Sequence, residues 1–281
     1  MAKLAIVYGD ERQQKLGERL EARGWVISHI ETNGAQAITP ALDGAQVVLL
    51  PVPATRDGAT VFRQENTGIL FSDLLSRLLP GTLLLGGLLP AQWVKSAREK
   101  GIAAMDYYQS ELVQLQNALP TAEGAIRLAM QALPVTLFGA RIGIVGYGRI
   151  GSLLAEKLTA LGAKVGVLAR APVALAQAAM HGAEAFSFAA GVPPFFVDCR
   201  ILFNTVPSRV LDQSFLCALP KTCHLIELAS PPGGFAPELA EKLQLRLIDG
   251  RGIPGRFYPE TAGEILAASV CEILSANGFV C

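Results

Sequence analysis

Short apolar runs alternate with helical segments along most of the chain, and this alternation limits the folds that it can adopt. The runs are four or five residues long, the length of a strand buried in a sheet. Amphipathic stretches such as residues 11–22, with Leu16 and Leu20 on one face, separate most of them. Strands that alternate with helices form parallel sheets covered on both faces. We therefore predict an α/β protein with two doubly wound, Rossmann-like parallel sheets. The predicted strands of one domain are residues 4–7, 25–29, 47–50, 82–85 and 102–105. Those of the other domain are residues 141–145, 164–168, 201–204, 224–228 and 245–248.

Two further helices resemble each other and are placed where they can link the domains. One is predicted from Pro120 to about Leu133, and the other from Pro259 to about Ser275, with Thr261 and Glu264 forming a capping box. The expected domains are residues 1–120, a flavodoxin-like or Rossmann-like domain joined by the C-terminal helix 259–281, and residues 121–258, a Rossmann domain. A cleft is expected between them.

Charge and hydropathy argue against several classes of partner. Lys and Arg number 24 and Asp and Glu number 24, so the net charge is zero at pH 7, unlike that of a nucleic-acid or polybasic membrane-surface protein. The longest apolar stretch, residues 78–89, is interrupted by Pro80 and Gly81 and is shorter than the roughly 20 residues of a membrane span. We expect neither a nucleic-acid nor a membrane partner.

The cysteines bear on the cellular compartment. There are five of them, an odd number, and none forms a Cys-x-x-Cys pair. Met1 leads directly into a predicted strand, so no signal peptide is expected. We therefore expect reduced thiols in a cytoplasmic protein. No grouping of His and Cys has the spacing of a metal site.

A glycine-rich motif carries the chemistry. It has the form Gly-x-Gly-x-x-Gly, follows an apolar strand, and precedes an amphipathic helix and a second strand. In this context the motif is typical of a dinucleotide site, where the glycines allow a tight turn and close approach of the pyrophosphate to the helix N-terminus. The predicted cofactor-binding residues here are Gly146, Tyr147, Gly148, Arg149, Ile150 and Gly151.

The end of the second strand favours NADP over NAD. An NAD site usually has Asp or Glu there, whereas this chain has Ala169 and Arg170, and an arginine can bind a 2′-phosphate. Residues 121–258 are therefore the predicted NADP-binding domain, and residues 1–120 the predicted substrate domain. Loops after later strands are expected at the same edge of the sheet and supply further cofactor-binding candidates, namely Asn204, Thr205, Pro207, Ala229 and Gly255.

The histidines argue against one reaction class. A 2-hydroxyacid dehydrogenase would need a catalytic His, but His29 and His224 fall in predicted strands and His181 ends a surface helix. Hydride transfer itself needs mainly orientation from the protein. A dehydrogenase of a 2-hydroxy acid or amino acid and a non-catalytic nucleotide-sensing module remain as alternatives.

Taken together, the loops resemble those of dipicolinate synthase A subunits. The similarity covers nearly the whole chain and lies in Gly9-Asp10-x-Arg12-Gln13, residues 50–55 (LPVPAT), residues 120–124 (PTAEG), the glycine motif, residues 204–208 (NTVPS), residues 228–234 (LASPPGG), and Pro254-Gly255 with residues 261–263 (TAG). The resemblance implies an NADP-dependent enzyme component that makes dipicolinate from a dihydrodipicolinate-type intermediate during sporulation, in the mother-cell cytoplasm. It also implies that the partner is a flavoprotein-like B subunit, and it leaves a homo-oligomer open.

A dicarboxylate substrate of this kind needs anion binders and a proton acceptor. Thr121 and Thr261 begin the predicted linking helices, whose positive ends could face an anion, and helix capping is their alternative role. The proposed substrate-binding residues are Arg12, Thr55, Arg56, Thr121, Ser230, Gly233, Gly234 and Thr261. The candidate proton acceptors are Asp10, Glu123 and Glu260, for which a structural role is the alternative.

Overall fold

The computed structural model describes residues 2–30, 35–62 and 68–281. The chain forms two compact units, one of residues 1–117 with 254–281 and one of residues 118–253. The sequence predicts boundaries close to these, after residues 120 and 258. In the described ranges, no helix combines the length and the apolar character needed to cross a bilayer.

The first unit is built on a five-stranded parallel sheet in the order β2-β1-β3-β4-β5. This is the strand order of flavodoxin-like folds. The strands are β1 (Lys3–Ile6), β2 (Val26–His29), β3 (Val47–Leu49), β4 (Leu83–Gly86) and β5 (Ala103–Asp106).

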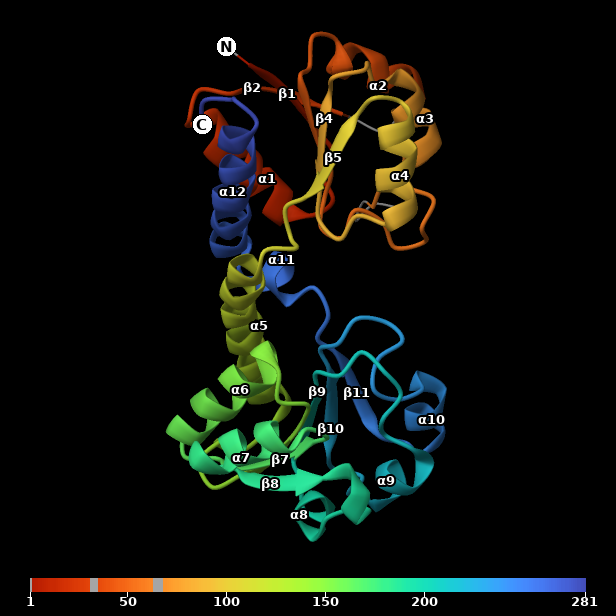
Figure 1. Cartoon of the computed structure of the whole chain (residues 1–281). Helices are drawn as coiled ribbons and strands as arrows, with labels where there is room; N and C mark the ends of the chain where they lie inside the picture. The colour runs from red at the N-terminus through yellow and green to blue at the C-terminus, as the bar shows by residue number, and fades with distance from the viewer. Residues whose placement is uncertain (1, 31–34, 63–67) are drawn as a thin grey trace. The chain divides into compact units, whose positions relative to one another are not determined.

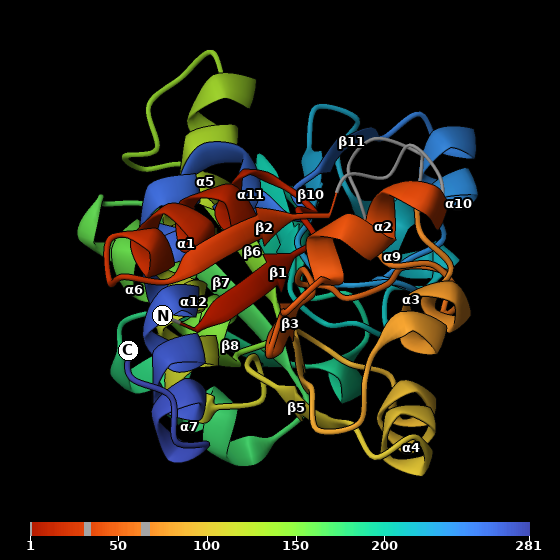
Figure 2. The same ribbon diagram turned by 90° about the horizontal axis from the view of Figure 1, so that it is seen from above.

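Helices cover both faces of this sheet (Figures 1 and 2). One face carries α1 (Glu11–Glu21) and the C-terminal helix α12 (Pro259–Ala276), and the other carries α2 (Ala35–Leu42), α3 (Phe71–Arg77) and α4 (Ala91–Glu99). The fully buried Val47 and Val48 alternate between the two cores. This two-sided burial explains why the strands are continuous apolar runs.

The second unit has a six-stranded parallel sheet in the order β11-β10-β9-β6-β7-β8. This is the strand order of the Rossmann fold. The chain adds strands toward one edge from β6 to β8 and toward the other edge from β9 to β11, so the switch point lies between β6 and β9. The strands are β6 (Arg141–Val145), β7 (Lys164–Ala169), β8 (Glu184–Ser187), β9 (Ile201–Asn204), β10 (His224–Glu227) and β11 (Arg246–Asp249). The helices are α6 (Arg149–Ala160), α7 (Pro172–Met180), α8 (Pro194–Val197), α9 (Gln213–Ala218) and α10 (Pro237–Lys242).

The α/β class and the two doubly wound sheets are thus confirmed, but three local predictions are wrong. Strand β8, a short edge strand whose residues are half-buried or exposed, was missed. The helix predicted from Pro120 is α5 (Glu111–Ala132), which begins nine residues earlier and continues through the proline. The capping box is absent: Thr261 is the third residue of α12, and the preceding Tyr258 makes no side-chain cap bond.

Helix α12 packs closely on α1 in the first unit. Gly263 makes this possible, because a Cβ there would lie 2.6 Å from the Lys15 Cβ and 3.0 Å from the Arg12 carbonyl oxygen. The C-terminal part of α12 adds Leu266, Val270 and Leu274 to the core beside β1.

The cysteines differ from expectation. Cys271 in α12 forms a disulfide with Cys281, so the prediction of five reduced thiols is wrong for this pair. Of the other three, Cys199 and Cys223 are buried and Cys217 is exposed. Burial raises the pKa of Cys223 to about 12, so this thiol is unreactive at neutral pH.

We predict that Gly263→Val lowers the free energy of unfolding by about 1–3 kcal/mol, because the added side chain forces α1 and α12 apart. Ala268→Val is the matched control, since Ala268 is exposed on the same helix. Urea denaturation of both variants checks this. An equal loss of stability in the two would contradict the close helix contact.

Candidate functional site

The turn between β6 and α6 has the geometry of a dinucleotide-binding loop. Gly146 follows β6 with a φ of +94°, which glycine adopts without strain. A Cβ on Gly151 would lie 2.3 Å from the Gly146 carbonyl oxygen. Both glycines are therefore required by the protein itself, for the turn and for the packing of α6 against it.

Gly148 is different, because the protein gives no packing reason for its missing side chain. Its φ is −93°, and a Cβ at this position would have no atom within 4 Å. It is the N-cap of α6, which receives no side-chain cap bond. The first amides of a helix attract anions, and the open space above Gly148 leaves room for a pyrophosphate. The residues of this loop thus fit a dinucleotide.

The ends of β7 and β6 lie side by side. The Gly146 amide donates to the Leu168 carbonyl at 2.8 Å. Ala169, the last residue of β7, is buried, and Arg170 after it is exposed. Arg149 begins α6 and is exposed, with Ile150 after it.

A residue that sequence reasoning set aside lies at this loop. The Tyr147 hydroxyl is 2.9 Å from Nδ1 of His181, the residue that follows α7. His181 thus supports the glycine loop, a contact for which the sequence carries no signal.

The loop after β9 is tied to the same edge of the sheet. The Thr205 hydroxyl donates to the Val145 carbonyl at 2.8 Å, which joins the ends of β9 and β6. Pro207 is exposed further along the loop. The Asn204 amide points to the neighbouring strand, where Nδ2 donates to Glu227 at 2.6 Å.

The loop after β10 uses the amides of two predicted substrate-binding residues for its own structure. The Gly233 amide donates to the Ser230 carbonyl at 3.0 Å, and the Gly234 amide donates to Glu227 at 3.0 Å. These bonds hold the loop, and substrate binding by its backbone stays a prediction. The Ala229 amide also donates a hydrogen bond to Glu227, whereas the Ser230 side chain is exposed.

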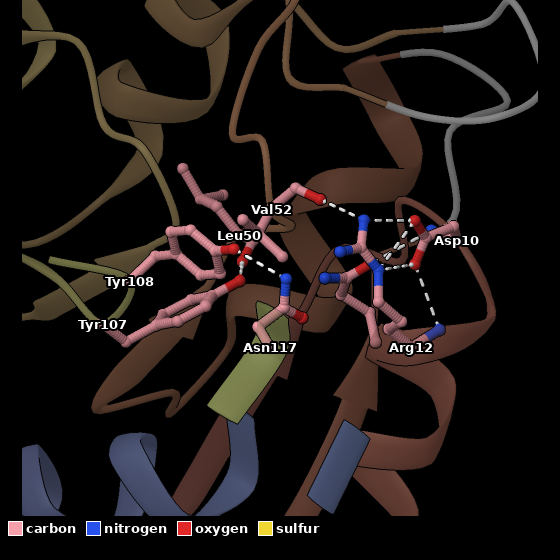
Figure 3. A network of polar contacts seen from close by, with 8 residues as sticks. Asp10, Arg12, Leu50, Val52, Tyr107, Tyr108 and Asn117 are labelled. Carbon is pink, nitrogen blue, oxygen red and sulfur yellow. Dashed lines mark hydrogen bonds and ion pairs between the residues drawn. The ribbon is translucent and has the colours of Figure 1, made fainter. Parts of the chain in front are cut away.

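In the first unit, the half-buried Asp10 and the buried Arg12 form a pair after β1, at the start of α1 (Figure 3). The Arg12 guanidinium donates to Asp10 Oδ2 at 2.6 Å and to the Val52 carbonyl at 2.7 Å. Asp10 also caps α1 by accepting from the Arg12 amide at 3.0 Å. Burial by itself would lower the Arg12 pKa, but the bonds and charge of Asp10 outweigh it and raise the pKa. These contacts give both residues a structural role.

Two tyrosines follow β5 at the same edge (Figure 3). The Tyr107 hydroxyl donates to the Leu50 carbonyl at 3.0 Å, and burial raises the pKa of this tyrosine. The Tyr108 hydroxyl accepts from Asn117 in α5 at 2.8 Å. They hold α5 and the loop after β3 against the sheet, and no motif in the sequence singles them out.

Arg56 lies on a loop that is held from within. Asp57 accepts hydrogen bonds from the Thr55 hydroxyl at 3.0 Å and from the Thr60 amide at 2.8 Å. Hydrogen bonds from Thr60, and to a lesser extent from its neighbours, lower the pKa of Asp57. The Arg56 guanidinium lies over the Phe62 ring at 4.0 Å and is exposed. A fixed loop therefore presents this cation to solvent.

The two remaining candidate proton acceptors are exposed and paired. Glu123 is 3.3 Å from Lys157, near the C-terminal end of α6 and so about 12 Å along the helix from the glycine loop. Glu260 is 3.0 Å from Lys15 and 3.6 Å from Arg19. Neither position gives a carboxylate the environment of a catalytic base.

Two other predicted positions differ from what the sequence suggested. Thr121 is buried in the middle of α5 and does not begin that helix, whereas Thr261 lies in the first turn of α12, as predicted. Gly255 lies in α11 (Ile253–Phe257), where a Cβ would be 2.7 Å from Asp10 Oδ2. The segment after β11 is thus a short helix at this residue, and the role of Gly255 in cofactor binding stays a prediction.

The remaining histidines have no catalytic setting. His224 is buried at the amino end of β10, opposite the loops described above, and burial lowers its pKa. His29 ends β2 and lies against Tyr8. Among the residues that the structure describes, no group of three His, Cys, Asp or Glu side chains is placed to hold a metal ion.

Comparison with known proteins places the chain in a family. Residues 3–108 match the model of the N-terminal domain of the dipicolinate synthase A subunit. The dipicolinate synthase A subunit of Bacillus subtilis is 30% identical over 97% of this chain and 96% of that protein. The chain belongs to the family of dipicolinate synthase A subunits.

Solved structures of this family agree with the fold. The dipicolinate synthase A subunit from Bacillus halodurans superposes with a TM-score of 0.83 at 27% identity, covering 98% of each chain. The Bacillus subtilis structure gives 0.78 at 27% identity, over 98% of this chain and 96% of that one.

The second unit has a wider relationship. Residues 102–231 match the NAD-binding domain of D-isomer-specific 2-hydroxyacid dehydrogenases. Together with the family, this makes the chain an oxidoreductase of the dehydrogenase type with a nicotinamide dinucleotide cofactor.

Two glycine variants distinguish a residue needed for cofactor binding from a residue needed for stability. We predict that Gly148→Ala weakens dinucleotide binding about tenfold with little change in melting temperature, because its Cβ enters space outside the protein. Gly151→Ala should instead lower the free energy of unfolding by about 1–3 kcal/mol. Calorimetric titration and thermal melting measure the two effects, and unchanged binding by Gly148→Ala would contradict the placement of the pyrophosphate.

Proposed function

We propose that the chain oxidises a dihydrodipicolinate-type substrate to dipicolinate (pyridine-2,6-dicarboxylate) with NADP. The reaction removes a hydride and a proton from the ring, and the gain of aromaticity favours it. The cofactor, when bound, accepts the hydride, and we assign the proton to solvent. The membership of the family and the dinucleotide-type loop of the second unit support this proposal.

Arg170 is the single observation that favours NADP over NAD. It follows β7 directly and is exposed, at the position where an NAD site usually has an acid. A guanidinium there can bind the 2′-phosphate with charge-assisted hydrogen bonds. Arg149 begins α6 beside the proposed pyrophosphate position and is a second cation of this region.

Arg56 and Ser230 are the substrate-binding candidates that the contacts favour. Arg56 is exposed on a loop fixed by Asp57, so it can bind a carboxylate at small entropic cost. The exposed Ser230 lies on the loop after β10. Arg12 and Asp10 bind each other, and we assign them the role of holding the loops of the first unit.

The name of the family also suggests a partner. The relatives are A subunits of dipicolinate synthases, and we propose that the partner of this chain is a flavoprotein-like B subunit. Homo-oligomerisation is a further proposal. The family resemblance leads us to place the reaction in the cytoplasm of the sporulating mother cell.

The 2-hydroxyacid dehydrogenase match of the second unit favours one alternative substrate class. An assay distinguishes it: the purified chain receives NADP and either a dihydrodipicolinate-generating system or a panel of 2-hydroxy acids. We expect ultraviolet absorbance of dipicolinate with the first and no NADPH with the second. Turnover of a hydroxy acid alone would support the alternative. Cofactor binding without any turnover, even when the proposed partner is present, would support a nucleotide-sensing role.

We predict that Arg170→Asp shifts the ratio of NADP to NAD affinity at least about tenfold toward NAD, because the 2′-phosphate loses a cation and meets a carboxylate. Arg200→Asp is the control for the change in net charge, since this exposed arginine precedes β9 at the opposite edge of the sheet. Fluorescence titration with both cofactors measures the ratio. The same ratio in Arg170→Asp and the unaltered protein would rule out the 2′-phosphate contact.

A further inference from the structure

Glu227 is a buried carboxylate to which the proposed reaction gives no role. It is the last residue of β10 and is 9% exposed. Its Oε1 accepts from Asn204 Nδ2 at 2.6 Å and from the Ala229 amide at 2.9 Å, and its Oε2 accepts from the Gly234 amide at 3.0 Å. One carboxylate thus holds three N–H donors, one at the end of β9 and two in the loop after β10.

The loop after β10 is closed over this carboxylate. A Cβ on Gly233 would lie 2.7 Å from Glu227 Oε2, and one on Gly234 would lie 2.5 Å from the Asn204 side chain. The Gly234 carbonyl in turn accepts from the Val210 and Leu211 amides of the loop after β9. The two loops therefore form one hydrogen-bonded assembly with Glu227 at its base.

The strand order gives this assembly its place in a dinucleotide site. The order in which the chain adds strands reverses between β6 and β9, with Arg170 after β7 on one side and Asn204 and Glu227 on the other. A dinucleotide lies across such a switch point. If the 2′-phosphate is bound at Arg170, the nicotinamide half of the cofactor faces the loops after β9 and β10.

We propose that Glu227 is a positioning residue for the nicotinamide half of the cofactor. Glu227 acts by accepting hydrogen bonds from Asn204 and from the amides of Ala229 and Gly234, and these bonds fix both loops. This inference rests on the proposed dinucleotide function. A small cavity of about 60 Å³ lies between Glu227, Ala229 and Gly233 on one side and Leu247 and Asp249 of β11 on the other.

Glutamine cannot replace glutamate here, although the two have the same shape. All three partners are donors, and they approach both carboxylate oxygens, whereas glutamine offers an acceptor on one side and an N–H₂ donor on the other. Whichever way the amide is turned, at least one N–H faces another N–H. Glu227→Gln should therefore release one loop while leaving the sheet and the turn at Gly146 in place.

The test compares a whole cofactor with a fragment that lacks nicotinamide. We expect Glu227→Gln to weaken NADPH binding about tenfold in calorimetry and to leave the affinity for 2′-phospho-ADP-ribose unchanged. Hydrogen exchange of the residue 229–234 segment in the protein without cofactor should become faster, and kcat should fall with little change in the KM of the dicarboxylate. Glu241→Gln, on the exposed face of α10, is the control and should change none of these.

Asn204→Ser provides a second variant, because its shorter side chain lacks the Nδ2 group that donates to Glu227, while the carboxylate keeps its two backbone partners. It should show the same selective loss for NADPH at a smaller fold-change. An equal loss for NADPH and the fragment, or no loss for either, in both variants would overturn the role of Glu227 while leaving the proposed function intact. An unaltered protein that binds neither compound would overturn both.

Discussion

The cofactor unit depends on the contact between the N-terminus of α6 and the turn that follows β6. Gly151 lies so close to the Gly146 carbonyl that no side chain fits between them, and this contact sets the direction in which α6 leaves the sheet. The uncapped amides of α6 then face the same edge as Arg170 and the loops after β9 and β10. An anion-binding helix end at a topological switch point follows from this packing.

The first unit uses buried polar contacts for a different purpose. The Asp10–Arg12 pair bonds to the Val52 carbonyl, and Tyr107 bonds to the Leu50 carbonyl, so the loops after β1, β3 and β5 are tied together (Figure 3). Removing one partner of a buried ion pair leaves an uncompensated charge, which makes such pairs strong constraints on structure. The residues that remain available for a substrate are then the exposed ones on the loops, Arg56 foremost.

Much of the fold was predictable because burial on both faces of a parallel sheet leaves apolar runs in the sequence. Ten of the described strands were anticipated from apolar runs, including the partly exposed edge strands β2, β5 and β11, and the edge strand β8 was missed. The start of α5 was missed because proline usually marks the first turn of a helix, whereas Pro120 lies inside this one. The glycine motif and Arg170 were recognisable because their spacing is local.

The non-local parts of the site were not predictable. That the Gly234 amide is bonded to Glu227, or that Gly255 lies against Asp10, depends on how distant segments meet. Glu227 itself looks like an ordinary end of a strand, and only its three donors distinguish it.

A crystal structure of the protein with NADP bound would test the proposed cofactor site most directly. We expect the pyrophosphate over Gly148 at the N-terminus of α6, the 2′-phosphate on Arg170, and the nicotinamide beside the loops after β9 and β10. A cofactor bound away from α6, or with its nicotinamide half on the side of β7, would contradict this site.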